Sequence, residues 1–173
     1  RRAALVTRVD EVRRIRLPPA TVLEQRLGRA GEARSELEAL LAATGDTLSV
    51  LRVLADLDQR LGDSLRAAPL WLRASAITTD RSEAADLARR ACEAYLTGGD
   101  VAAARRVLDG MEAWAHSGRL LELRVEVERS GEDPRGLANA VDDLAAHESV
   151  DAARRARLLV EGARGYHAGG EAE

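Results

Sequence analysis

The sequence predicts an all-α fold of stacked antiparallel helix pairs, and regularly spaced glycines are the main reason. Five Gly-acid dipeptides follow one another at intervals of 31, 37, 32 and 39 residues: Gly31-Glu32, Gly62-Asp63, Gly99-Asp100, Gly131-Glu132 and Gly170-Glu171. They separate runs whose apolar residues recur at helical spacing, and no segment alternates like a half-buried strand. Glycine commonly ends a helix, and an acid stabilises the positively polarised start of the next one. We therefore expect a turn between two helices at each dipeptide.

The composition supports a folded core and argues against several classes of function. Hydrophobic residues make up 46% of the 173-residue chain but aromatic residues only 2%, so Leu, Val and Ala must build most of the core. All 26 basic residues are arginine, and 29 acidic residues leave a net charge of -3 with interleaved signs, which disfavours nucleic acid. No apolar run approaches the roughly 20 residues of a membrane helix. We expect a soluble, cytoplasmic protein without nucleic-acid or membrane partners.

Five helices are expected in the first half of the chain. Pro18-Pro19 interrupts the first amphipathic run, because proline disfavours the helical conformation of the residue before it. Gly45-Asp46 falls midway between two of the dipeptides, and we interpret it as a turn between two helix pairs. The expected helices span about residues 1–16, 20–30, 32–44, 47–61 and 64–77.

Five more helices are expected beyond residue 80, where two of the starts are marked by local signals. Asp80 and Glu83 have the spacing of an acidic capping box. Pro134, which follows Asp133, suits the first turn of a helix. These helices are expected at about residues 81–97, 100–116, 118–130, 134–147 and 149–168.

We expect one domain over residues 1–173, consisting of a leading helix at 1–17 and four to five helix pairs in 18–173. The chain starts at Arg1 without an initiator methionine, and we interpret it as a piece of a longer protein.

Aligned on their glycines, the helix pairs carry bulky and small residues at matching offsets. In the pair around Gly62 these residues are Leu51, Leu54, Ala55, Ala67, Trp71 and Ala74. In the pair around Gly99 they are Ala91, Cys92, Tyr95, Ala104 and Leu108. Tyr95 and Tyr166 each stand four residues before a glycine of the series, where the pair around Gly62 has Asp58. Over residues 18–170 this pattern resembles the tetratricopeptide repeat family, which has an aromatic residue at that position.

The resemblance implies a right-handed α-solenoid, a superhelix whose concave groove holds a segment of a partner protein. The groove would be lined by outward-facing positions of the first helix in each pair, namely Arg52, Asp56, Gln59, Arg60, Arg89, Glu93, Glu128 and Arg164. An ordinary solvated helix face would look the same, with Arg52 and Asp56 as an i,i+4 ion pair. The chain has no lysine, and Asp56 and Glu93 occupy positions where family members that bind chaperone tails have asparagine, so that activity is not expected.

No residue pattern indicates an enzyme, a cofactor or a metal site. His116, His147 and His167 stand singly, without a second ligand at helical spacing. Cys92 occupies a small-residue position and is expected to be a buried, inert thiol. The paired glycines follow helices and lack a lysine, so they do not form a phosphate-binding loop. Trp71 is expected in the core, whereas Trp114 is a candidate contact residue.

We therefore expect a scaffold that binds a protein or peptide, and two alternatives stay open. The domain could regulate a larger multidomain signalling protein through contacts with flanking domains of the same chain. It could also assemble with itself, through the apolar faces at 1–16 or 149–168.

Overall fold

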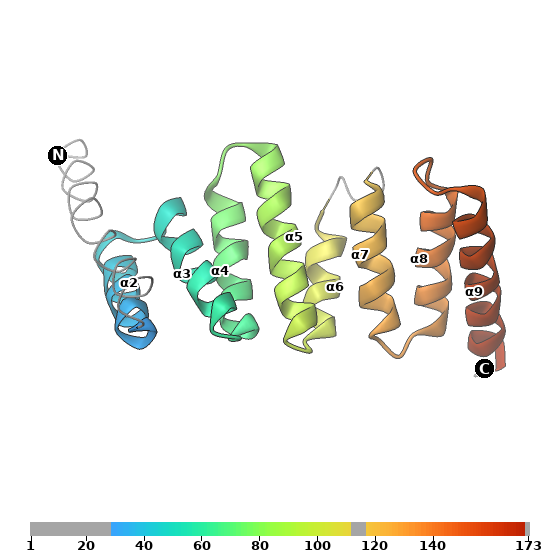
Figure 1. The fold of residues 1–173 in the computed structure, drawn as a ribbon, viewed down its shortest axis with the longest axis horizontal. Coiled ribbons are helices and arrows are strands. Elements are labelled where there is room, and N and C mark those ends of the chain that lie inside the picture. Colours follow the sequence, from blue (N-terminus) through green and yellow to red (C-terminus); the bar gives the residue numbers. More distant parts are fainter. Residues whose placement is uncertain (1–28, 112–116, 172–173) are drawn as a thin grey trace. The chain divides into compact units, whose positions relative to one another are not determined.

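The computed structural model describes residues 29–171 except 112–116, and these residues form eight α-helices and no strand. The helices are α2 (Ala30–Thr44), α3 (Leu48–Arg60), α4 (Ser64–Ile77), α5 (Arg81–Thr97), α6 (Val101–Asp109), α7 (Gly118–Arg129), α8 (Pro134–Ala146) and α9 (Ala152–Glu171). Neighbours in the sequence pack against one another, as α3 does with α4 and α8 with α9 (Figure 1). The all-α prediction is confirmed. The helix expected at 1–16 lies outside the described residues. The helix expected at 20–30 also lies outside them, except for its last two residues.

The chain divides into two compact units, which are described separately. The first lies within Arg1–Ala94 and contains α2, α3, α4 and most of α5. The second lies within Tyr95–Glu173 and contains α6, α7, α8 and α9.

Glycines form the turns between several helices, as the sequence predicts. Gly45, Gly62 and Gly99 have φ angles of 71°, 82° and 83°, a region that glycine enters without steric cost. After Gly62, the amide of Asp63 donates to the carbonyl oxygen of Asp58 at 2.8 Å, which closes the end of α3. The Asp133 carboxylate accepts from the first amides of α8, where Pro134 takes the first position, also as predicted.

Two dipeptides and the end of one helix differ in position from the prediction. Gly31 lies in the first turn of α2 and Gly170 in the last turn of α9, so both of these glycines lie inside helices. A glycine inside a helix costs only about 1 kcal/mol relative to alanine, which neighbouring packing can offset. The helix expected at 100–116 ends at Asp109, where the Gly110 amide donates to the Arg106 carbonyl oxygen.

A buried carboxylate holds α2 against α3 in the first unit. Asp58 is 1% exposed, at the position where the family pattern has an aromatic residue. The Arg34 Nε atom donates to Asp58 Oδ1 at 2.6 Å, and the same guanidinium also binds Asp63. A buried carboxylate and its half-buried arginine partner thus occupy the place of an aromatic side chain. The core predictions for Trp71 and Cys92 are confirmed, since both are 0% exposed.

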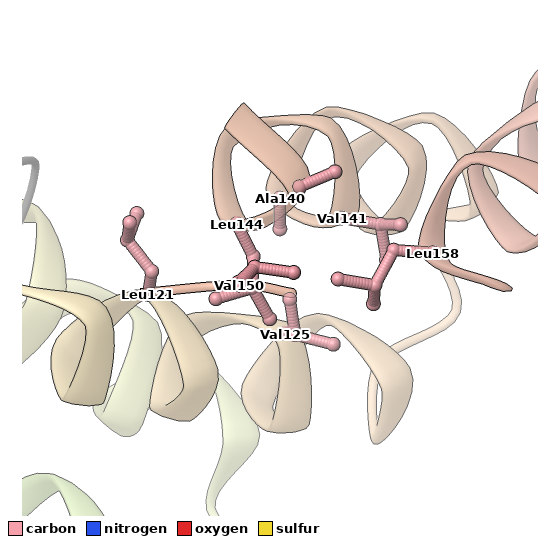
Figure 2. Packing of buried hydrophobic residues seen from close by; sticks show 8 residues of the cluster. Leu121, Val125, Ala140, Val141, Leu144, Val150 and Leu158 are labelled. Atoms are coloured by element: carbon pink, nitrogen blue, oxygen red, sulfur yellow. The ribbon is translucent and has the colours of Figure 1, made fainter. Parts of the chain in front are cut away.

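The core of the second unit gathers aliphatic side chains from α7, α8, α9 and the loop before α9. Leu121 and Val125 come from α7, while Val141 and Leu144 come from α8. Figure 2 shows them packed together with Val150 and Leu158. As the sequence predicts, aliphatic residues and alanine supply this core.

Glycines bring α9 close to α8. A Cβ atom on Gly165 would lie 2.9 Å from the carbonyl oxygen of Pro134, and one on Gly162 would lie 2.7 Å from Asp142 Oδ1. Gly165 has no room for a side chain while the backbone of α8 stays in place, whereas a Cβ atom at Gly162 would require only the Asp142 carboxylate to move. The Tyr166 hydroxyl, on the same helix, lies 2.9 Å from Asp142 Oδ2 and donates to it. This hydrogen bond raises the pKa of Tyr166.

Arg155 fixes the first turn of α9 to the end of α8. Its Nε atom donates to the carbonyl oxygen of Ala145 at 2.8 Å, and its Nη2 atom donates to that of Val150 at 3.1 Å. A single side chain therefore satisfies carbonyl groups of α8 and of the loop that follows.

Candidate binding surface

In the first unit, α3 and α5 together line a hollow of about 550 Å³. We call the charged residues around it the α3–α5 surface; they are Arg52, Asp80, Glu83, Asp86, Arg89 and Arg90. Arg52 and Arg89 are two of the groove residues expected from the sequence. The surface carries three cations and three acids, so its charges balance.

Local sequence signals position the acidic edge of this surface. Asp80 precedes α5, and its Oδ1 atom accepts from the amides of Ser82 and Glu83 at 2.8 and 3.1 Å, as predicted for a helix start. The Glu83 carboxylate does not complete a capping box. Its two oxygens accept instead from Thr78 Oγ1 and from Arg52 Nη1, each at 2.7 Å.

Ion pairs join α3 to α5, whereas the sequence suggested a pair within α3. Arg52 binds Glu83 of α5, and Asp56 lies 3.5 Å from Arg90 Nη1 of α5, so Arg52 and Asp56 do not pair with each other. The side chains of the Arg52–Glu83 pair are 47% and 32% exposed. Exposed pairs of this kind contribute only about 0.2–1 kcal/mol, so an incoming charged group can replace either member.

Arg89 is the most enclosed cation of the α3–α5 surface. Its side chain is 14% exposed, and it binds Glu93 one turn further along α5. Its Nε atom is buried without a hydrogen-bond partner, although Asp86 Oδ1 lies 3.7 Å away. A buried donor without an acceptor is unfavourable, and an oxygen atom from a ligand could satisfy it.

Sequence reasoning missed Arg90. Its guanidinium lies over the ring of Trp71, 5.0 Å from the ring centroid, within the range of a cation–π contact. The buried tryptophan thus orients a cation at the rim of the hollow. A signal was present, because Arg90 follows Asp56 by 34 residues, about one repeat length, and carries the opposite charge.

The remaining candidates of the first unit lie near the same helices. Gln59 and Arg60 are exposed at the end of α3, and neither lines the hollow. Glu93 is half-buried beside Arg89 on α5.

The two candidates of the second unit differ in their exposure. Glu128, expected to face outward, is 4% exposed and accepts from Arg105 Nε and Nη2 at 3.1 and 2.6 Å. A buried carboxylate needs such a partner, which binds it to α6 rather than leaving it available to a ligand. Arg164 is exposed on α9, where it borders a shallow apolar depression.

In the described part of the chain, no group of three His, Cys, Asp or Glu side chains could hold a metal ion. In the same residues, no helix combines the length and the apolar character needed to cross a membrane. Trp114 and His116, the other candidates considered, lie outside the described residues.

Compared with models of known protein families, with curated proteins and with solved structures, the chain matches none.

Proposed function

We propose that the chain is a scaffold of helical repeats, similar to tetratricopeptide repeats, which binds a segment of a partner protein on the outward faces of its first helices. The proposal includes the right-handed superhelix that the resemblance implies. The observation that carries it is the α3–α5 surface, where Arg52 and Arg89 line one hollow.

The contacts of this surface suit the reversible binding of a polar segment. A partner carboxylate can replace Glu83 at Arg52 or Asp56 at Arg90 at small cost, because both pairs are exposed to water. A partner oxygen that reaches Arg89 gains more, since it would satisfy the buried Nε donor. The balance of charges lets the surface select a pattern of alternating charge in its partner rather than any acidic chain.

The test is a pull-down from an extract of the source organism, with bound proteins identified by mass spectrometry. Arg52→Glu and Arg89→Glu place acids beside Glu83 and Glu93, and we expect both to lose the partner of the unchanged protein. Arg119→Glu is the matched control, because Arg119 is exposed on α7 of the second unit and does not line the hollow. Circular dichroism checks that all variants remain helical. If the first two variants keep the same partner as the control, the binding surface is assigned wrongly.

A further inference from the structure

One side of α9 packs on α8 while the other side exposes aliphatic residues. Leu158 and Gly162 are buried against α8. Leu159 and Val160 are 51% and 54% exposed. Val160 borders a shallow depression together with Ala163, Arg164, His167 and Ala168. We call these five residues and Leu159 the outer face of α9; exposed apolar groups gathered in this way commonly mark a contact surface.

The charged residues of α9 fall into two groups. Those on the inner side bind back to earlier helices, since Arg154 Nη2 donates to Glu122 of α7 and Glu161 accepts from Arg129 of α7, both at 2.7 Å. Arg157 and Arg164, by contrast, are exposed and make no ion pair or hydrogen bond with any described residue. Two cations without partners therefore accompany the apolar outer face.

We infer that the outer face of α9 binds an amphipathic, acidic α-helix of a partner protein. The partner's apolar residues would cover Val160 and Ala163, and its carboxylates would pair with Arg157 and Arg164. Apolar contact would supply most of the affinity, and the two ion pairs would select acidic over basic helices.

The face of α7 that meets α8 shows that this fold accepts such a helix. Leu121 and Val125 of α7 share one buried cluster with Ala140, Val141 and Leu144 of α8. A helix that presents small and bulky apolar residues therefore has a precedent in the second unit.

Charge argues against a second copy of this chain as the occupant. Two α9 helices placed face to face would bring Arg157 and Arg164 of one copy near those of the other. Like charges at an interface are unfavourable, and the one acid on this part of the helix, Glu161, already binds Arg129.

The experiment titrates the whole chain with two synthetic helical peptides. Both carry the apolar residues of 134–146, and the other positions are mostly glutamate in one peptide and mostly arginine in the other. We expect the acidic peptide to bind at least about ten times more tightly, by fluorescence anisotropy of a peptide label. Equal binding of both peptides, or none of the acidic one, would overturn the inference.

Three variants locate the binding. Val160→Asp is expected to weaken the acidic peptide about tenfold or more, because it places a like charge in the apolar contact. Leu65→Asp is its control, since Leu65 is 51% exposed on α4 of the first unit and is not part of the outer face of α9. Arg164→Glu should reduce the preference for the acidic peptide. Equal losses in the Val160 and Leu65 variants would contradict the assignment.

Sedimentation velocity at the titration concentrations tests for self-association. We expect a single species of 18.6 kDa without peptide. A dimer that Val160→Asp dissociates would mean that a second copy is the occupant, and the inference would then be wrong. These peptide measurements do not involve the α3–α5 surface, so the proposed function can fail while this inference holds.

Discussion

The junction of α2 with α3 and the junction of α8 with α9 hold neighbouring helices together by different means. At α2–α3, Arg34 reaches across to the buried Asp58 and to Asp63, so a charged clamp fixes the spacing. At α8–α9, Gly165 lets the two backbones approach until there is no room for a side chain. A charged clamp needs both of its side chains, whereas a close backbone contact needs a glycine, which has no side chain. Mutations should therefore damage the two junctions in different ways.

The largest effect is expected at the charged clamp. Arg34→Leu leaves the Asp58 carboxylate buried without its main partner and should lower the free energy of unfolding by about 3 kcal/mol. Urea denaturation followed by circular dichroism measures this loss. The double variant with Asp58→Leu should recover much of the stability, because it also removes the buried charge. Arg52→Leu is the exposed control and should cost only about 0.2–1 kcal/mol. A double variant that loses as much as the two single changes added together would contradict the clamp.

A smaller effect is expected at the close contact. Gly165→Ala places a Cβ atom 2.9 Å from the Pro134 carbonyl oxygen, and the backbone must move to accept it. We expect a loss of about 1–3 kcal/mol in the same denaturation experiment. Gly170→Ala is the control on the same helix, because nothing lies within 4 Å of its Cβ position. If the Gly165 variant is as stable as the Gly170 variant, the α8–α9 contact is less tight than described.

The smallest effect is a shift in titration at α8–α9. Tyr166 donates to Asp142, which raises its pKa, so the neutral phenol is favoured in the folded state. The contribution to stability is complete below the ordinary tyrosine pKa of about 10 and is lost as the pH rises through the higher folded value. Ultraviolet absorbance of phenolate in a Tyr95→Phe background isolates Tyr166. Adding Asp142→Asn should lower the titration midpoint, and an unchanged midpoint would exclude Asp142 as the cause.

Most helices of the described residues could be predicted from the sequence, because their ends carry local signals. The bounds of α4 and α5 agree with the expected 64–77 and 81–97. Gly62 and Gly99 mark turns through their positive φ angles. Gly31 and Gly170 are also followed by an acid but lie within helices, since a dipeptide does not reveal how much packing favours the helical conformation.

The charged contacts could be predicted only in part. Helical spacing suggests that Arg52 pairs with Asp56, but both bind residues of α5 because the neighbouring helix brings Glu83 and Arg90 within reach. The position of Glu128 relative to Gly131 predicts that it faces outward, but the structure buries it against Arg105. Which charged side chains meet depends on the distance between neighbouring helices, and a repeat pattern in the sequence does not reveal that distance.

The contacts of Arg155 determine how α9 can detach. Because this side chain is bound to the carbonyl groups of Ala145 and Val150, the first turn of α9 is tied to the rest of the second unit. The last turns are tied to α8 through Tyr166, which is 43% exposed and bonds the side chains of Asn139 and Asp142. Local unfolding of α9 should therefore begin at its C-terminal end and proceed toward Arg155, which would leave the loop before the helix intact until last.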